Sequence, residues 1–491
     1  MRAPGLMKRA YRSIIDPIET MRSKIDGRSL LLVLFWMGML AITAAFGFVV
    51  PMVEEWLIVA AVIALLAGIA FTIYLLSNLY VGFYLLIPGA LFFSLEIGTG
   101  SQTGLNIAVL LVLYLFGLWI FKMIVVDQQI RVFRSRPLLP LILFMVSVTF
   151  SMLIGQLRWF PTNGAPLRAQ LGGLGVFYLS GFAFIIFSQL VPNLRVLRKI
   201  HWIFVVSASI FLLMLVVLTF MPVSLAQAIS RWIPISAGGS MLWVWIATFV
   251  FSQLVFNRKL NLIVRLALIG VMIAFMYSRF IDGRNWTSGW LPAFVAIVTV
   301  LLIGAPRYGI ALGMVGGIAM LLNWALVSSQ VMGGDNVYSL STRTEAWIVL
   351  AKIIMVNPIT GFGPANYYWY THLYNILGYF VPFNSHNNYV DIIAQAGLMG
   401  LGFYLWFMFE VGRLGYSIYL KLPEGFAKVF TLSCIGGLAG VLVGGMFGDW
   451  VLPFVYNVRL AGFRASMIPW LFFGGLVVIE RSLKDGSFEN I

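Results

Sequence analysis

Apolar residues recur along this chain in blocks of about 20, the length of helix that crosses roughly 30 Å of hydrocarbon. The hydrophobic residues make up 61% of the 491 positions and the charged ones 10%, against about 25% charged in an ordinary soluble domain. The blocks lie near 29–50, 56–76, 79–98, 105–125, 138–156, 171–190, 201–220, 240–256, 261–277, 287–303, 309–327, 388–412, 429–447 and 465–480. They exclude a soluble protein and predict an all-α, polytopic membrane protein with about 14 transmembrane helices, within a range of roughly 12–14.

The basic residues are distributed unevenly between the connecting segments. The formal net charge is +15, and the segment 1–28 is rich in Lys and Arg. If the chain is threaded back and forth from a cytoplasmic N-terminus, most of the 32 Lys and Arg residues fall on the cytoplasmic side. We therefore expect both termini in the cytoplasm, and we expect the block 29–50 to be a retained span because it is too long for a signal peptide. A re-entrant arrangement at the uncharged joint 77–80 would invert the topology downstream.

The long interval between the predicted spans, 328–387, falls on the outer, periplasmic face. Structureless loops of such length are uncommon and often functional, so we expect a loop subdomain with short helices there. One cysteine and three histidines exclude a disulfide framework and leave little for a metal site, and we expect no metal, no cofactor and no nucleic-acid partner. The predicted organisation is a basic tail over 1–28, transmembrane helices 1–11 over 29–327, the loop over 328–387, helices 12–14 over 388–480 and a cytoplasmic tail over 481–491.

The first motif of the loop is Thr342-Arg343-Thr344-Glu345, which has the spacing of a helix capping box. It predicts a helix that starts at Thr342, runs to about Val356 and carries an apolar stripe suited to the membrane surface. Arg343 then lies in the first turn, where a cation is disfavoured by roughly 0.3–1 kcal/mol. An anion shared by the guanidinium and the helix end would reverse that effect. Alternatively, Glu345 or Asp335 neutralises Arg343.

Polar residues gather again at the end of the loop, in Asn384-Ser385-His386-Asn387-Asn388-Tyr389. A neutral imidazole at His386, beside amides and a serine, has the chemistry to take a proton from a hydroxyl group. In the alternative interpretation, His386 belongs to a capping cluster and only bonds backbone groups. The aromatic run Tyr367–Tyr370 between the two motifs is typical of sugar stacking or of an interfacial belt.

Arginines on the predicted outer side form a further group of candidates. Arg279 and Arg284 lie close together above a predicted helix end, and Arg168 with Arg158 lies in another outer loop. Guanidinium groups bind phosphate through paired hydrogen bonds, which suits recognition of a phosphorylated substrate. Contact with lipid headgroups is the competing interpretation for each of these arginines.

Taken in order along the chain, these motifs resemble those of the O-antigen ligase and O-antigen polymerase superfamily. Ser278-Arg279 followed by a span is similar to an upstream motif of that family, with either Arg279 or Arg284 at the family's arginine position. The main resemblance lies in one contiguous region and comprises Arg343, Trp347, Asn357-Pro358, Gly361-Phe362-Gly363, His386-Asn387-Asn388-Tyr389 and Gly397-Leu398-Met399-Gly400.

The resemblance implies an inverting, metal-independent glycosyltransferase whose active site faces the periplasm at a bacterial inner membrane. The donor would be a glycan on undecaprenyl diphosphate, and the acceptor a hydroxyl of lipid A-core, another glycan or a protein. Arg343, with Arg279 or Arg284, would stabilise the diphosphate that leaves, and His386 would act as the general base. Residues expected to bind substrate or orient the base are Arg168, Trp347, Gly361, Gly363, Asn387, Asn388 and Tyr389.

Two other functions fit the same motifs. A transporter or flippase of lipid-linked oligosaccharide would need arginines that bind phosphate but no base. A non-catalytic envelope assembly protein would need neither. A proton-coupled transporter usually carries carboxylates or histidines near the middle of its spans, and the predicted spans here do not show that pattern. Within the glycosyltransferase interpretation, ligase and polymerase activities both stay open.

Overall fold

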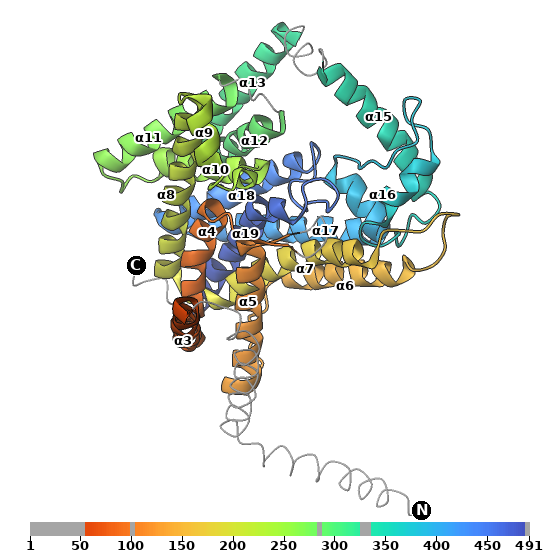
Figure 1. Cartoon of the computed structure of the whole chain (residues 1–491). Helices are drawn as coiled ribbons and strands as arrows, with labels where there is room; N and C mark the ends of the chain where they lie inside the picture. Colours follow the sequence, from red (N-terminus) through yellow and green to blue (C-terminus); the bar gives the residue numbers. More distant parts are fainter. Residues whose placement is uncertain (1–54, 99–103, 282–286, 325–334, 487–491) are drawn as a thin grey trace, which may run out of the picture. The chain divides into compact units, whose positions relative to one another are not determined.

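The computed structural model describes residues 55–98, 104–281, 287–324 and 335–486 (Figure 1). The predicted basic tail, the first span, Arg284 and the start of the loop subdomain lie outside these residues. The described part is mainly helical. Its one sheet is a short antiparallel ribbon of β1 (Glu96–Ile97) and β2 (Leu105–Asn106), with Glu96 opposite Asn106. The expectation of an all-α protein is confirmed for the described residues.

The chain divides into two compact units, Met1–Leu79 with Gly117–Val132 and Tyr80–Phe116 with Phe133–Ile491. In the first unit the structure describes α3 (Glu55–Ser77) and the π-helix η3 (Lys122–Val126). All the candidate site residues belong to the second unit. Its helices are η2 (Leu79–Val81), α4 (Gly82–Phe92), α5 (Ile107–Phe121, whose last turn belongs to the first unit), α6 (Leu138–Ile154), α7 (Leu167–Leu190), α8 (Leu194–Thr219), α9 (Val223–Ser230), η4 (Ile235–Ala237), α10 (Ser240–Phe256), α11 (Leu262–Met276), η5 (Tyr277–Ile281), α12 (Thr287–Gly304), α13 (Pro306–Leu322), α15 (Asp335–Ile354), α16 (Asn366–Tyr370), η6 (Thr371–Leu373), α17 (Asn388–Tyr419), α18 (Phe426–Gly444), η7 (Leu460–Gly462) and α19 (Phe463–Lys484).

Each predicted apolar block from 56–76 onward overlaps a helix of the structure. Among the described residues, the helices long and apolar enough to cross a membrane number 7, namely Ile107–Val126, Leu167–Leu190, Leu194–Thr219, Leu262–Arg279, Asn388–Tyr419, Phe426–Gly444 and Leu460–Lys484. The number of candidate spans rises to eight if Leu65–Ser77 and Leu79–Phe92, which a short break separates, form one span. Helices α6, α10 and α12 are apolar but shorter. The 14 spans and their topology stay predictions.

Helix α19 lies at the centre of the second unit and is buried along its whole apolar length. The ring of Phe472 on α19 packs against Phe204 of α8, Phe249 of α10 and Phe430 of α18. Helix α18 approaches α12 closely through glycine, since a Cβ at Gly440 would lie 2.8 Å from a backbone oxygen of α12. Small residues permit such contacts between membrane helices, where lipid provides no hydrophobic force to join them. These contacts hold α18 against α19 and α12.

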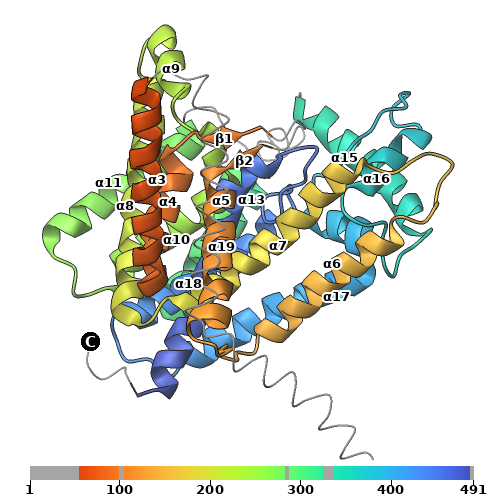
Figure 2. The ribbon, with the colours of Figure 1, turned by 60° about the horizontal axis from the view of Figure 1, so that its bottom comes forward.

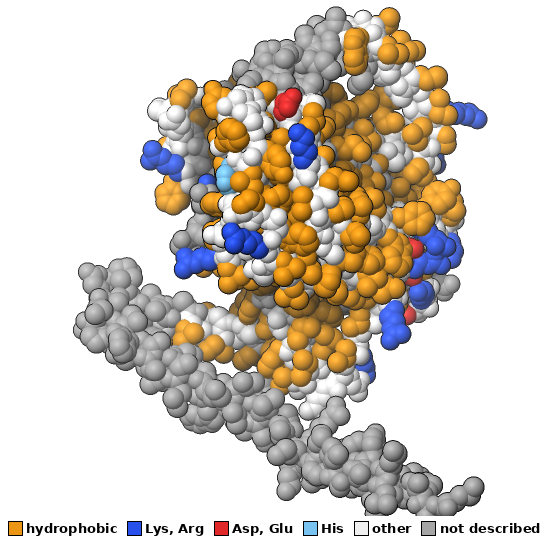
Figure 3. Space-filling model, turned by 90° about the vertical axis from the view of Figure 1, so that its right-hand side faces the viewer, with side chains coloured by type: hydrophobic (Ala, Val, Ile, Leu, Met, Phe, Trp, Pro, Cys, Tyr) orange, Lys and Arg blue, Asp and Glu red, His pale blue; other side chains and the backbone are white. Residues whose placement is uncertain are grey.

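Helix α6 packs against α7 and α17 at one side of this centre, as both ribbon views show (Figures 1 and 2). Helices α15 and α16 gather near the start of α17, at the same end of the unit. Hydrophobic side chains dominate much of the face in Figure 3, as expected for a surface that contacts lipid. The N-terminus of α17, which directly follows His386, is thus held by helices on several sides.

Helix α17 is interrupted at Gly397, whose φ of 69° and ψ of −178° are not helical. The segment 358–363 crosses the break, and the amide of Phe362 donates to the Ala394 carbonyl (2.9 Å) while that of Leu398 donates to the Pro358 carbonyl (2.8 Å). A Cβ at Gly397 would overlap the carbonyl of Ile359. Only glycine combines this backbone conformation with so close a crossing. The crossing anchors the described part of the loop onto α17.

Candidate functional site

A cavity of about 350 Å³ brings Arg343 and His386 together. The side chain of His386 is 42% exposed, so the cavity gives access to the imidazole from outside. Two of the residues predicted to be catalytic therefore share one space. The lining comprises Thr342, Arg343 and Ala346 from α15 and Ile376, Phe383, Asn384 and His386 from the segment that leads to α17.

The helix that carries Arg343 begins earlier than the capping box predicts. Helix α15 starts at Asp335 rather than Thr342, so the predicted cap was wrong and Arg343 lies inside the helix. An anion at the helix end therefore offers no explanation for Arg343. The apolar stripe also differs from the expectation, because it does not face the membrane surface. It packs in a buried core whose members are Phe160, Val349, Leu350, Ile353, Phe362, Tyr367, Tyr370, Ala394 and Phe454.

Arg343 is a partly buried cation with hydrogen-bonding capacity to spare. Its Nε is buried and has no hydrogen-bond partner among the described residues. Glu345 is not within ion-pair distance of it in the described part of the chain, and the Asp335 side chain lies outside the description. Burial lowers the pKa of Arg343, and the charge of Asp449 opposes that shift. The guanidinium nevertheless stays charged, because arginine does not lose its proton in proteins.

The imidazole of His386 lies against a buried carboxylate that belongs to the loop after α18. Its Nδ1 is 3.9 Å from Oδ1 of Asp449 and 3.3 Å from Nδ2 of Asn457. The Asn457 amide donates to both Asp449 oxygens, at 3.0 and 2.9 Å. Burial raises the pKa of Asp449 to about 6, although the Asn457 hydrogen bonds and the charge of Arg343 oppose the shift. The side chain, which is 1% exposed, is therefore mostly ionised at pH 7 and takes up a proton as the pH falls toward 6.

Burial lowers the pKa of His386, and the positive charge of Arg343 lowers it further. Both effects disfavour the imidazolium, so the ring is neutral near pH 7. A neutral ring is the form that accepts a proton. An arginine beside a histidine therefore does two things here, because it offers a cation to the cavity and keeps the neighbouring base unprotonated.

His386 has a strained backbone, with a φ of 48° in the left-handed region that residues other than glycine seldom adopt. Its two neighbours are held tightly. The Trp347 indole donates to the Ser385 carbonyl (2.8 Å), the Ser385 hydroxyl donates to Asp391 (2.6 Å), and the Asn387 side chain caps α17 by accepting from the Tyr389 amide (2.9 Å). Strain of about 1–3 kcal/mol persists only where the surroundings enforce it. These bonds enforce the orientation of the imidazole.

Several residues predicted to bind substrate make hydrogen bonds within the structure. The Asn388 amide donates to the Leu452 carbonyl (2.8 Å) and accepts from the Val451 amide (2.9 Å), and the Tyr389 hydroxyl donates to the Leu442 carbonyl (2.6 Å). These bonds fix the start of α17 to the loop that carries Asp449. With the helix cap at Asn387 and the Trp347 tether, they position His386 against Asp449.

The glycines of the Gly361-Phe362-Gly363 motif also have a structural place. Both are buried and have positive φ, 68° at Gly361 and 82° at Gly363. A Cβ at Gly361 would lie 2.6 Å from the Gly397 amide nitrogen, and one at Gly363 would lie 3.0 Å from the Ser151 carbonyl. They allow the crossing over α17 and α6, and neither is part of the cavity lining.

Arg279 and Arg168, the other candidate arginines in the described part of the chain, do not line the cavity that Arg343 lines. The Arg279 guanidinium lies 4.4 Å from the centre of the Trp243 ring and donates to the Ser278 hydroxyl (2.7 Å). Arg168 lines a different cavity of about 440 Å³, formed mainly by α5 and α7. Arg284 is outside the described residues. Of the arginines predicted to act in the reaction, only Arg343 therefore shares a described cavity with His386.

No protein-family model matches this chain, and neither does any curated protein. The interpretation of the site therefore depends on its geometry. Sequence reasoning missed Asp449 and Asn457, which follow α18 and lie far along the chain from His386. A carboxylate at the outer end of a predicted span was visible in the sequence, but nothing local connected it to the histidine. The folded chain makes that connection through the bonds of Asn388 to the loop that carries Asp449.

Proposed function

We propose that this chain is a membrane glycosyltransferase of the O-antigen ligase or polymerase type, multi-pass in a bacterial inner membrane with its site on the periplasmic side. The observation that carries the proposal is the pairing of a neutral, carboxylate-backed His386 with the cation of Arg343 around one cavity. That combination suits a reaction in which a hydroxyl loses a proton while an anion departs. A glycan on undecaprenyl diphosphate is the donor that offers such a leaving group.

His386 has the role of general base in this proposal. The nearest polar neighbour of Nδ1 is the donating amide of Asn457 at 3.3 Å, and the Asp449 carboxylate at 3.9 Å attracts the positive charge that the ring gains with a proton. The acceptor oxygen attacks the anomeric carbon as its proton passes to the neutral imidazole. General-base assistance of this kind contributes typically about 10²–10⁴-fold. The acceptor is a hydroxyl of lipid A-core, of another glycan or of a protein.

Arg343 has the role of stabilising the leaving group. The bond from the anomeric carbon to the diphosphate oxygen breaks as the new bond forms on the opposite face, and the electron pair leaves with the diphosphate. The configuration at the anomeric carbon is inverted in such a single displacement. The fixed charge of Arg343, whose side chain lines the cavity, suits the growing negative charge. No metal ion is required by this scheme.

The alternatives make weaker use of the same residues. A flippase of lipid-linked oligosaccharide has a use for Arg343 but none for an imidazole with a buried carboxylate behind it. An assembly protein without catalytic activity has no use for the strained backbone at His386, which costs about 1–3 kcal/mol. The His386 and Asp449 pairing therefore favours the transferase over both alternatives.

The decisive experiment compares His386→Ala with His372→Ala in the purified protein, with a lipid-linked glycan donor and a hydroxyl acceptor. His372 lies in the same segment but does not line the cavity, which makes it a matched control. We expect His386→Ala to lose about 10²–10⁴-fold in rate and His372→Ala to keep it. Full transfer activity in both variants would refute the role of His386 as general base. If lipid-linked glycan crosses vesicle membranes equally well with both variants, the protein would instead be a flippase.

Ligase and polymerase activities are separated in a deletion strain by gel analysis of surface polysaccharide. Long chains left on the lipid carrier indicate a lost ligase, because assembly is complete but transfer fails. Single repeat units on the carrier indicate a lost polymerase. If the deletion strain and the His386→Ala and Arg343→Ala variants all show unchanged surface glycan, the proposed transferase activity is contradicted.

A further inference from the structure

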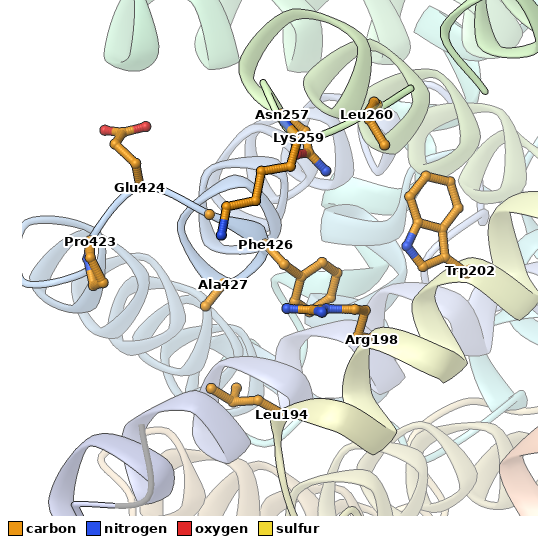
Figure 4. A pocket seen from close by; sticks show the side chains of 11 residues that line it. Leu194, Arg198, Trp202, Asn257, Lys259, Leu260, Pro423, Glu424, Phe426 and Ala427 are labelled. Carbon is orange, nitrogen blue, oxygen red and sulfur yellow. Dashed lines mark hydrogen bonds between the residues drawn. The ribbon is translucent and has the colours of Figure 1, made fainter. Parts of the chain in front are cut away.

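A second cavity, of about 510 Å³, lies where two connections of the second unit meet the start of α8 (Figure 4). It is formed by the start of α8, the connection from α10 to α11, and the connection from α17 to α18. The lining residues are Leu194, Arg198, Trp202, Asn257, Lys259, Leu260, Pro423, Glu424, Gly425, Phe426 and Ala427.

This cavity lies at the opposite ends of α17 and α18 from the site of His386. Helix α17 begins after His386 and ends at Tyr419, and α18 begins at Phe426 and ends before Asp449. With 19 residues, α18 is about 28 Å long at 1.5 Å per residue, close to the thickness of the hydrocarbon layer. The cavity is therefore on the side that the distribution of basic residues predicts to be cytoplasmic.

Two cations point into this space. Figure 4 shows Arg198 of α8 and Lys259 of the connection between α10 and α11 extending toward the same region beside Phe426, while the carboxylate of Glu424 points away. The Arg198 guanidinium lies 5.2 Å from the centre of the Phe426 ring. Glu424 is paired with Lys428 at 2.7 Å. No carboxylate of the described residues lies within ion-pair distance of Arg198 or Lys259, so the space has a net positive charge.

The rest of the lining is largely apolar, with Leu194, Trp202, Leu260, Phe426 and Ala427 around the two cations. A water-soluble anion needs the cations but not these side chains. Basic pockets between membrane helices on the cytoplasmic side bind the headgroups of anionic lipids. Tryptophan is also common at the level of the headgroups, where one end of the ring is in water and the other in hydrocarbon.

We propose that this cavity binds the phosphodiester of an anionic phospholipid. Arg198 and Lys259 contact the phosphate oxygens, and Trp202 with Phe426 contacts the glycerol and the first carbons of the acyl chains. The shared chemistry is a phosphate group, which a lipid headgroup or free phosphate can supply. The site is remote from Arg343 and His386, and it does not depend on the proposed transferase activity.

The experiment measures lipid retained by the full-length protein in neutral detergent, by native mass spectrometry during titration with phosphatidylglycerol or phosphatidylcholine. We expect preferential binding of phosphatidylglycerol, weakened about 25-fold by the double substitution Arg198→Gln with Lys259→Gln. The control is Arg134→Gln with Arg307→Gln, which removes two exposed cations that the topology places on the same side. Control and parent should bind phosphatidylglycerol equally.

A second variant, Arg198→Lys with Lys259→Arg, keeps both charges and should retain most of the preference, which separates lost charge from lost folding. Equal binding of phosphatidylglycerol by the Gln variant and its control would overturn the proposal. A further arm adds inorganic phosphate at millimolar concentration. If phosphate leaves the binding of phosphatidylglycerol undiminished, the lipid is the source of the bound phosphate group. If phosphate displaces the lipid, the lipid proposal is refuted and the site is assigned to a soluble phosphate compound.

Discussion

The substitution Asp449→Asn is the sharpest test of whether His386 acts as a base. It removes one negative charge and preserves the size of the side chain. In the structure the carboxylate is almost completely buried, receives two hydrogen bonds from Asn457 and lies 3.9 Å from Nδ1 of His386. In the proposed reaction that carboxylate stabilises the imidazolium that forms.

The expected magnitude follows from the distance. When the imidazole takes up a proton, it gains a positive charge 3.9 Å from the carboxylate. At an effective dielectric constant of about 20, two unit charges at this separation attract by about 4 kcal/mol. The His386 side chain is 42% exposed, so solvent screening reduces the attraction, and we take about half of it. A loss of about 2 kcal/mol from the transition state lowers kcat about 30-fold.

The assay determines kcat and KM separately, from initial rates of glycan transfer by the purified protein with saturating acceptor. We expect the loss to lie in kcat, because Asp449 interacts with a charge that appears only during the reaction. Glu410→Gln is the control, since it neutralises a carboxylate on α17 that lines neither cavity and should leave kcat unchanged. A kcat for Asp449→Asn within twofold of the parent, with equal thermal stability, would refute the reasoning.

Three more predictions concern the same site. Because burial and the Arg343 charge lower the pKa of His386 from 6.5, and burial raises that of Asp449 to about 6, the acid limb of kcat/KM should lie below pH 6.5 and report both groups; Arg343 lowers both pKa values, so Arg343→Gln should move the limb to higher pH while lowering kcat about 10²-fold or more. Gly397→Ala should lower the thermal stability by about 2 kcal/mol or more because of its positive φ and the crossing backbone, whereas Gly402→Ala, at an open position, should be tolerated in the same melting experiment. Trp347→Phe removes the indole bond to the backbone next to His386 and should lower kcat with little change in KM, whereas a rise in KM alone would indicate direct substrate contact.

The helices of this protein were predictable because their signal is local. An apolar run needs no distant partner to form a helix in lipid, since every backbone hydrogen bond is made within the segment. Each apolar block in the described part of the chain accordingly overlaps a helix. The start of α15 was not predictable in this way. Thr342 and Glu345 have the spacing of a cap, but the same spacing fits residues on one face inside a longer helix.

The candidate site was predictable only where its residues are near each other in a motif. Arg343 and His386 were chosen for their chemistry and their order, and they do line one cavity. The glycines were assigned to substrate, yet their role depends on backbone crossing a broken helix, which spacing alone does not reveal. The sequence does not connect Asp449 with His386, because their contact spans two connections and the full length of α17 and α18.

The distribution of roles around His386 has a physical reason. A base must be aimed at one oxygen, and a histidine at the end of a loop has neither a regular backbone nor a covalent restraint to aim it. Here the restraint comes from bonds to its neighbours, the Trp347 indole at Ser385 and the Asn387 cap of α17, which together hold a left-handed backbone. Most polar groups of the motif are therefore used up in orienting one imidazole. Few remain for the sugar, so we expect recognition of the glycan to depend on shape and on the acceptor's own contacts more than on the residues that surround the base.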